Sequence, residues 1–346
     1  MKTAYIKHLF LWGCILCALQ PPLHAQSPQF SQYYAAPLLI APSFAGNSLG
    51  SRAFINYRDQ WAKLPGSFVT YSVALDNNFY AINSGIGLVF LRDIVGAAKY
   101  GNTMIKGLYS YRFNVTGDWR IRPGVYFAWE QRSMNFSSAV FPDQIWEDRI
   151  DPVSSLEPQI PPYSFFDAGA SAVVYNSRMW IGLTVDHLMR PETSLSRMNN
   201  RSPMQWSQFG GFNFKLNRGL GKPLQALSVN YLFKTSRNFY QFDAGVNWIR
   251  APMMLGLAWR GLPAFNTGYA SYDAAIFSVG YAFRNVSVGY SYDFTISSLG
   301  PATGGSHEIT VSISFNEGAK KDRKGSVPCP DVVRNLMFGA DKEFYR

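Results

Sequence analysis

The sequence predicts an all-β protein, a transmembrane antiparallel β-barrel of about 14 strands, and three observations support this prediction. Charged residues make up only 16% of the 346 residues, while apolar residues make up 47% and aromatic residues 16%. Ordinary soluble domains carry about 25% charged residues. Apolar and small side chains alternate with period two along many segments, which is the pattern of a β-strand. After the first residues, no apolar run reaches the roughly 20 residues of a membrane-spanning helix.

The two faces of the expected strands differ in an unusual way. A soluble β-sandwich would place Lys and Glu on its outer face. Here large apolar residues alternate with Gly, Ser, Ala and Thr, which suits an apolar face toward lipid and a crowded polar lumen. The residues expected to contact lipid include Val288, Tyr290, Tyr292, Val311 and Ile313, and those expected to face the lumen include Ser291, Asp293 and Ser312.

Fourteen strand segments can be placed along the chain, and the links between them differ in length. The segments begin near Ser51, Ser67, Ser84, Asn102, Trp119, Phe165, Met179, Trp206, Leu224, Asn238, Met253, Asp273, Val286 and His307. The tight links include residues 114–118, 176–178, 250–252 and 284–285, and the long links include residues 133–164, 188–205, 261–272 and 294–306. With a periplasmic N-terminus, every tight turn falls on the periplasmic side, as in outer-membrane barrels. An even strand number also returns the C-terminus to the periplasm, beside the N-terminus.

The first segment of the chain has the features of a signal peptide. Residues 1–25 combine a positively charged start with an apolar run over residues 9–19 and small residues before Gln26, where we expect the mature chain to begin. Acylation at Cys14 is the less favoured alternative, because the apolar run before it is short. Removal of the signal peptide leaves Cys329 as the single cysteine of the mature chain, so no internal disulfide is expected.

Residues 26–48 precede the expected barrel, which covers residues 49–315. Three prolines exclude a continuous helix or a central strand in this segment, yet it is rich in apolar residues. One hypothesis is that it packs against the barrel or plugs the lumen, since burial is the usual fate of such residues. The other is that it binds a partner. The candidate residues for either role are Gln29, Phe30, Gln32, Tyr33, Tyr34 and Phe44.

Residues 316–346 form an extension beyond the last expected strand. One interpretation is a solvated tail. The other is a periplasmic docking peptide, in which a basic run meets an acidic partner and apolar residues anchor it. The candidate docking residues are Lys320, Lys321, Arg323, Lys324, Leu336 and Phe338.

The sequence predicts no catalytic, cofactor-binding or metal site, and hence no enzyme. His187 and His307 are the only histidines of the mature chain, and no serine lies in a nucleophile-elbow pattern. Two isolated histidines and one cysteine lack the spacing of a zinc site. Nucleic-acid binding is also not expected, because the positive charge is scattered rather than gathered in a stripe.

Several short motifs, taken in order, resemble one family. Near the N-terminus these are Pro-Gln-Phe-Ser-Gln-Tyr-Tyr-Ala-Ala-Pro at residues 28–37 and Ala-Pro-Ser-Phe-Ala-Gly at residues 41–46. Further motifs lie at residues 56–61, 68–72, 131–136, 141–145, 259–263, 291–297 and 304–308. Together they resemble the PorP/SprF family of the type IX secretion and gliding-motility system of Bacteroidetes, over residues 28–315.

This resemblance implies an outer-membrane barrel that acts with the secretion machinery. The implied partners are secreted cargo adhesins, the periplasmic ring and motor components, and outer-membrane lipid. The family offers no catalytic residues to carry over. The alternative function is an outer-membrane transporter or pore for small or hydrophobic molecules, because a barrel fold does not decide between the two.

Overall fold

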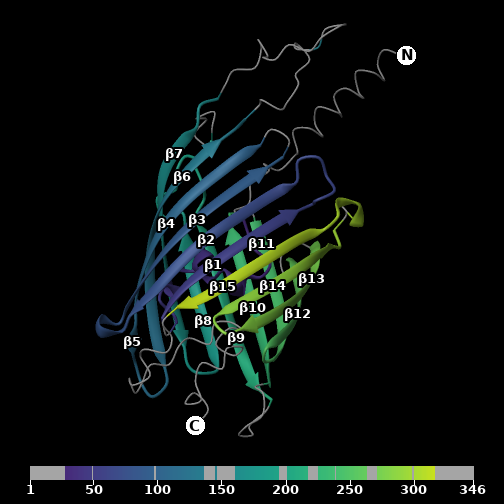
Figure 1. Cartoon of the computed structure of the whole chain (residues 1–346). Helices are drawn as coiled ribbons and strands as arrows, with labels where there is room; N and C mark the ends of the chain where they lie inside the picture. Colours follow the sequence, from purple (N-terminus) through teal and green to yellow (C-terminus); the bar gives the residue numbers. More distant parts are fainter. Residues whose placement is uncertain are drawn as a thin grey trace, which may run out of the picture.

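The computed structural model describes residues 28–48, 50–96, 99–135, 145, 160–194, 201–216, 225–237, 239–262, 271–297 and 300–315. These residues form one antiparallel sheet of 15 strands. Fourteen of the strands close into a barrel, and the short strand β5 lies outside the closed ring (Figure 1). The predicted fold class and strand number are confirmed.

Each barrel strand begins within two residues of the start expected from the sequence. The strands are β1 (Ser51–Gln60), β2 (Phe68–Phe79), β3 (Ser84–Val95), β4 (Tyr100–Tyr111), β5 (Phe113–Asn114), β6 (Arg120–Ser133), β7 (Tyr163–Tyr175), β8 (Met179–Asp186), β9 (Gln205–Lys215), β10 (Gln225–Ser236), β11 (Phe239–Arg250), β12 (Met253–Leu262), β13 (Ser271–Phe283), β14 (Val286–Thr295) and β15 (Ser306–Phe315). The helical segments are η1 (Tyr33–Ala35), α2 (Pro37–Ile40), η2 (Pro42–Phe44), η3 (Tyr80–Ile82) and η5 (Pro301–Thr303). Within the described ranges, no helix has the length and apolar character needed to cross a bilayer.

The barrel closes where the first and last strands meet. β1 pairs with β15 along its whole length, from Ser51 opposite Phe315 to Gln60 opposite Ser306. The extra strand β5 does not interrupt the ring, because β4 pairs directly with β6. Each of the fourteen barrel strands therefore has a hydrogen-bonded neighbour on both sides, so the ring has none of the free edges that an open sheet exposes.

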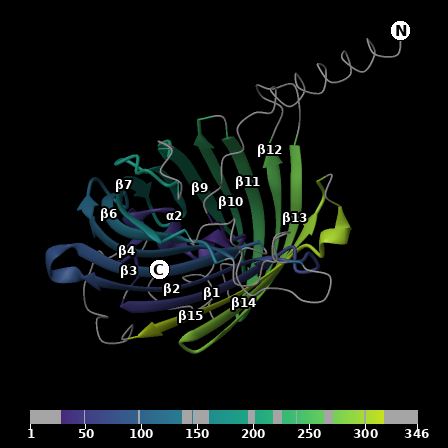
Figure 2. The ribbon, with the colours of Figure 1, turned by 90° about the horizontal axis from the view of Figure 1, so that it is seen from above.

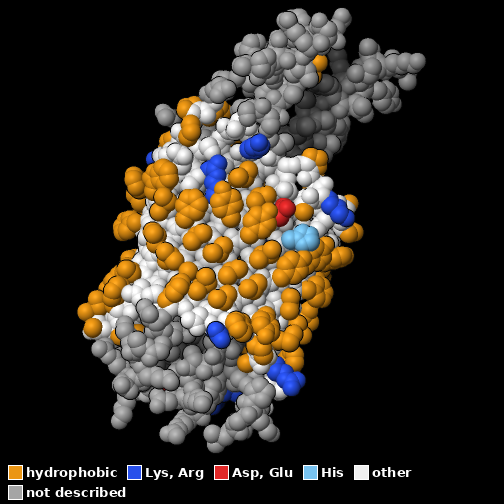
Figure 3. All heavy atoms as spheres, in the orientation of Figure 1, with side chains coloured by type: hydrophobic (Ala, Val, Ile, Leu, Met, Phe, Trp, Pro, Cys, Tyr) orange, Lys and Arg blue, Asp and Glu red, His pale blue; other side chains and the backbone are white. Residues whose placement is uncertain are grey.

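The two faces of the barrel wall follow the predicted alternation. On β14, Val288 and Tyr290 are exposed on the outer face, whereas Ser291 and Asp293 are buried on the inner face. Hydrophobic side chains cover the barrel face shown in Figure 3, and Lys and Arg lie near its upper and lower margins. An outer band of this kind is suited to lipid. The predicted facing of these residues is confirmed.

The two ends of the barrel carry different links. We call the end where β15 finishes at Phe315 the short-turn end, and the opposite end the long-loop end. The longest links, between β6 and β7 and between β8 and β9, lie at the long-loop end, as expected. Three links break the expected rule: residues 96–99 and 237–238 form tight links at the long-loop end, and residues 216–224 form a longer one at the short-turn end.

Residues 28–48, here called the lumen segment, run through the barrel from one end to the other. Near the long-loop end, Gln29 contacts Asp243 of β11. Near the short-turn end, the Gly46 amide donates to Asp76 of β2 at 2.8 Å. Seen along the barrel in Figure 2, α2 of this segment lies inside the ring of strands.

The first and last described residues lie at opposite ends of the barrel, and the termini themselves lie outside the described residues. Pro28, the first described residue, lies beside Lys234 and Asp186 near the long-loop end. Phe315, the last described residue, ends β15 at the short-turn end. The lumen segment therefore adds one more crossing of the barrel to those of the fourteen strands, and its irregular sequence gives no sign of this crossing.

The lumen is apolar where the second half of the lumen segment passes, contrary to the simple expectation of a polar lumen. Leu38, Ala41 and Phe44 are almost fully buried and form one cluster with wall residues of β3, β4, β6, β7, β8 and β9. Pro37 and Pro42 begin the short helices α2 and η2, where a missing backbone N–H costs nothing. The prolines thus fold the segment into compact turns that bury its apolar residues.

Glycines in the wall let the lumen segment approach closely. A Cβ atom at Gly124 of β6 would lie 2.5 Å from the backbone nitrogen of Ser43, and one at Gly85 of β3 would lie 2.2 Å from the carbonyl oxygen of Ala45. Both neighbours are backbone atoms, so a side chain at either position would push the segment away from the wall.

We predict that Leu257→Lys, on the outer face of β12, destabilises the barrel by about 2–4 kcal/mol, because a lysine near the bilayer midplane faces lipid. Leu257 is 61% exposed on the outer face. Urea unfolding in phospholipid vesicles measures the change, and Leu257→Met is the matched control. An unchanged midpoint for the lysine variant would show that this face does not contact lipid.

We also predict that Gly124→Ala lowers the free energy of unfolding by about 1–3 kcal/mol, the usual cost of overpacking. The control is Gly107→Ala on β4, where a Cβ would meet nothing within 4 Å. The same unfolding assay compares the two variants. Equal stabilities would contradict the close packing of the lumen segment on β6.

Candidate functional site

The N-terminal half of the lumen segment is held by a carboxylate of the barrel wall. Glu308 of β15 accepts the backbone amide of Ser31 at 2.6 Å through one oxygen and that of Gln32 at 2.9 Å through the other. An irregular segment cannot satisfy these amides by itself, and a buried unpaired N–H is costly. A single wall residue therefore fixes two consecutive amides of the segment.

Ser31 lies at the centre of a buried cluster, here called the charged clamp, formed by Ser31, Arg58, Arg260, Asp293 and Glu308. The Ser31 hydroxyl donates to Asp293 at 2.5 Å and accepts from Arg58 at 2.5 Å and from Arg260 at 3.1 Å. Arg58 also pairs with Asp293 at 2.8 Å and with Glu308 at 3.3 Å. Four strands, β1, β12, β14 and β15, thus converge on one serine of the lumen segment.

The charges of the clamp are removed from solvent. Glu308 is 0% exposed, Asp293 2% and Arg58 3%. Removing one partner of a buried ion pair costs about 3–5 kcal/mol, because the other charge is left uncompensated. The clamp therefore depends on every member, including the hydroxyl from the lumen segment.

Both candidate glutamines take part in contacts with the wall. The Gln29 side-chain amide donates to Asp243 at 2.7 Å, and its oxygen accepts from Lys234 at 3.1 Å. The Gln32 side-chain amide donates to Ser291 at 3.3 Å, and its oxygen accepts from Thr310 at 3.2 Å.

The four aromatic candidates also lie inside the barrel. Tyr33 donates its hydroxyl to Asn230 of β10, and Tyr34 donates to Ser278 of β13 at 3.2 Å. The Phe44 ring lies 5.2 Å from that of Phe209, and Phe30 is 3% exposed. The structure thus brings all six N-terminal candidates together in the lumen.

The candidate docking residues of the C-terminal extension fall outside the described part of the chain. They are Lys320, Lys321, Arg323, Lys324, Leu336 and Phe338. The two histidines do not share a site. His187 follows β8 and pairs with Asp167 at 2.7 Å, while His307 packs on Tyr292, with ring centres 5.0 Å apart. No cluster of three potential metal ligands occurs among the described residues.

Sequence reasoning missed Ser31 and the barrel residues of the clamp, although a signal was present. Arg58, Arg260, Asp293 and Glu308 each lie within one of the motifs quoted above, at residues 56–61, 259–263, 291–297 and 304–308. Each is a charge at an inward-facing strand position, where small or polar residues are the rule. Isolated charges on the inner face of several strands could have indicated a shared lumen site.

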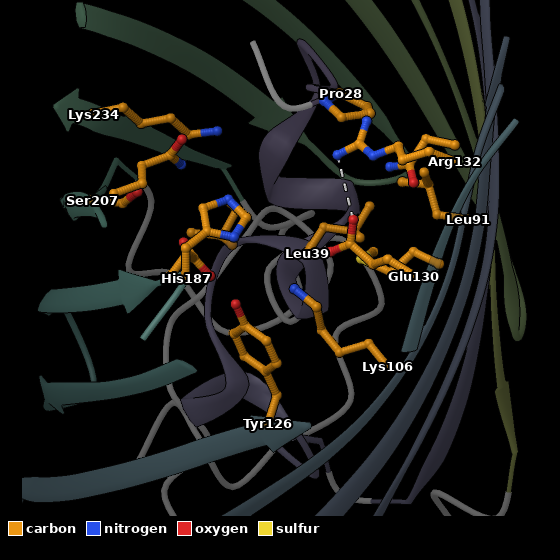
Figure 4. Close-up of a pocket in the computed structure, with 15 residues that line it drawn as sticks. Pro28, Leu39, Leu91, Lys106, Tyr126, Glu130, Arg132, His187, Ser207 and Lys234 are labelled. Carbon is orange, nitrogen blue, oxygen red and sulfur yellow. Dashed lines mark hydrogen bonds and ion pairs between the residues drawn. The ribbon is translucent and has the colours of Figure 1, made fainter. Parts of the chain in front are cut away.

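A cavity lies between the lumen segment and the barrel wall formed by β3, β4, β6, β8, β9 and β10. Pro28, Leu39 and Ile40 of the lumen segment line one side of it. Figure 4 shows Lys106, Glu130 and Arg132 on one wall of this space and His187, Ser207 and Lys234 on the other.

Solved structures similar to this chain are barrels of low sequence identity. Omp33 of Acinetobacter baumannii is 8% identical, with 78% of this chain and 100% of that chain covered and a TM-score of 0.43. The CymD monoaromatic hydrocarbon channel is 9% identical (85% and 95% covered, TM-score 0.45), and the P. putida toluene transporter TodX is 7% identical (79% and 92% covered, TM-score 0.42). Likeness of this size carries no argument about function. No curated protein sequence matches the chain.

The family match covers most of the chain. The family described as type IX secretion system membrane protein PorP/SprF matches residues 23–313, a span that contains the lumen segment and every member of the charged clamp. A closed antiparallel barrel with an apolar outer band is a fold of the bacterial outer membrane. The chain therefore belongs to the PorP/SprF family of type IX secretion membrane proteins and is an outer-membrane β-barrel.

Proposed function

We propose that this barrel supports the export and surface attachment of cargo adhesins through contacts with protein partners at its ends, rather than by conducting molecules through its lumen. The observation that carries the proposal is the occupied lumen. The lumen segment crosses the barrel and is held at one end by the charged clamp and at the other by Asp76. Family membership supplies the secretion context.

We further propose that the short-turn end faces the periplasm. Outer-membrane barrels keep short turns inside and long loops outside, and the two longest links lie at the opposite end. In this orientation Pro28 lies near the outer face, and the chain after Phe315 enters the periplasm. The periplasmic ring and motor components would then meet the basic residues of the extension, which are Lys320, Lys321, Arg323 and Lys324. Cargo would meet the long-loop end.

A transporter or pore is the alternative function, and the cavity beside the lumen segment is the observation that favours it. Displacement of the lumen segment, which lines the cavity through Pro28, Leu39 and Ile40, would join this cavity to the rest of the lumen. The two functions differ in one measurable property, because a pore conducts ions in its functional state and a barrel closed by its own segment does not.

We predict that the unaltered protein is closed in planar bilayers and that Glu308→Ala produces frequent ion-conducting openings, because it removes the acceptor of two lumen-segment amides. Deletion of residues 28–46 should open the barrel fully. Asp118→Asn, at an exposed turn, is the control and should stay closed. Steady conductance by the unaltered protein would favour the pore instead.

The orientation predicts opposite accessibility at the two ends of the mature chain. In intact cells, a membrane-impermeant maleimide should not label Cys329 but should label Ser27→Cys in a Cys329→Ser background. Labelling of Cys329 from outside would show that the barrel has the opposite orientation. Protection of both positions would contradict a lumen segment that begins near the outer face.

The role in secretion predicts a separable defect in a truncated protein. A chain ending after Phe315 keeps every described strand and should insert normally, yet it should display less adhesin at the cell surface and lose cross-links to periplasmic components. The control replaces only residues 339–346 with a Gly/Ser stretch, which leaves the basic run and Phe338 in place. Normal adhesin display by the truncated chain would show that the extension has no docking role.

A further inference from the structure

The cavity at the long-loop end has a lining of two kinds. Its volume is about 80 Å³, enough for several water molecules. Apolar side chains of the lumen segment, Leu39 and Ile40, face apolar wall residues Leu91 and Met104 across part of it. The remainder is lined by charged and polar side chains from β4, β6, β8, β9 and β10.

Lys106 of β4 is a buried cation that lacks a counter-ion of its own. The residue is 7% exposed, and its ammonium lies 3.9 Å from the centre of the Tyr126 ring. Among the described residues, no carboxylate pairs with it. Figure 4 shows the side chain reaching into the cavity. A ring face offsets only part of the cost of burying an ammonium.

Two more groups in the cavity are incompletely satisfied. Lys234 of β10 points into the cavity from the opposite wall (Figure 4), and its one hydrogen bond within the described part of the chain goes to the neutral oxygen of Gln29, at 3.1 Å. The side-chain oxygen of Asn102 on β4 is buried, and no described residue donates to it.

The carboxylates among the described lining residues do not pair with either lysine. Glu130 pairs with Arg132 at 3.5 Å, and among the described residues Asp186 forms no ion pair with Lys106 or Lys234. Two lysines on opposite walls therefore share a cavity, and no carboxylate of the described residues forms an ion pair with either of them. Buried charges in proteins are normally paired, so an anion between the two lysines would supply their missing counter-charge.

We infer that the cavity binds a carboxylate carried on an apolar body, which reaches it from the long-loop end. Lys106 and Lys234 hold the carboxylate, and Leu39, Leu91 and Met104 contact the carbons behind it. The inference goes beyond the proposed function, because it does not depend on a role in secretion. Two sources share this chemistry: the free C-terminus of a peptide with apolar last residues, and a small aliphatic acid.

Calorimetric titration of the full-length protein in detergent separates these sources. The probes are N-acetyl-leucyl-leucine, with its C-terminal amide as the neutral counterpart, and hexanoate, with hexanol as its counterpart. At least one acid should bind, and its neutral counterpart should bind about tenfold more weakly, because it lacks the charged hydrogen bonds to the lysines. The acid that binds identifies the source. Absence of binding by both acids, or equal binding of acid and neutral forms, would overturn the inference.

Matched variants locate the site. Lys106→Met and Lys234→Met should each weaken acid binding about tenfold while leaving binding of the neutral counterpart unchanged. The control is Lys215→Met, which replaces a half-buried lysine near the short-turn end of β9. Acid affinity equal to that of the unaltered protein in both cavity variants would place the ligand elsewhere. The acid-to-neutral comparison needs no variant, so it still decides the inference if a variant fails to fold.

Discussion

The contact of Glu308 with the amides of Ser31 and Gln32 is the interaction on which the rest of the lumen depends. An irregular segment inside a barrel has backbone groups that no strand satisfies, and lipid and protein interiors do not tolerate them unpaired. Side chains of the barrel wall satisfy five of them. Glu308 accepts two amides, Ser171 accepts the Ser43 amide, Asp76 accepts the Gly46 amide, and Ser110 donates to the Ala45 carbonyl. The lumen face of the barrel is therefore shaped for one particular chain path.

Ion pairs and hydrogen bonds dominate the contacts of the first half of the lumen segment, and apolar packing dominates those of the second half. Near the long-loop end the clamp fixes Ser31 by charge, and this hold depends on exact pairing because its members are buried. Toward the short-turn end, Leu38 and Phe44 pack into an apolar cluster against the wall, and Gly85 and Gly124 admit the backbone at close range. The polar half is the part that a change of a single charge can release. The apolar cluster also includes Phe30 and Tyr33 of the first half, so packing against the wall extends along the whole segment.

Much of the fold could be predicted from the sequence, and less of the site. Strand starts followed from period-two alternation, which is a local property, and they match the structure within two residues. Gln29, Tyr33 and the other N-terminal candidates were identified because prolines and apolar residues coincide there. The clamp was not identified, because Arg58, Arg260, Asp293 and Glu308 are far apart in the chain and meet only when β1 closes on β15. The crossing of the lumen by residues 28–48 was also missed, since an irregular segment carries no periodicity from which a direction can be inferred.

The central claim is that residues 28–48 are folded inside the barrel and held there by Glu308. Hydrogen–deuterium exchange of the protein in phospholipid vesicles tests it most directly, because exchange reports the opening of individual amides. The amides of Ser31, Gln32 and Gly46 should be protected to a degree comparable with those of β14 and β15, and Glu308→Ala should remove the protection of Ser31 and Gln32 while leaving that of Gly46. Exchange of the whole segment at the rate of an unfolded peptide in the unaltered protein would contradict the account.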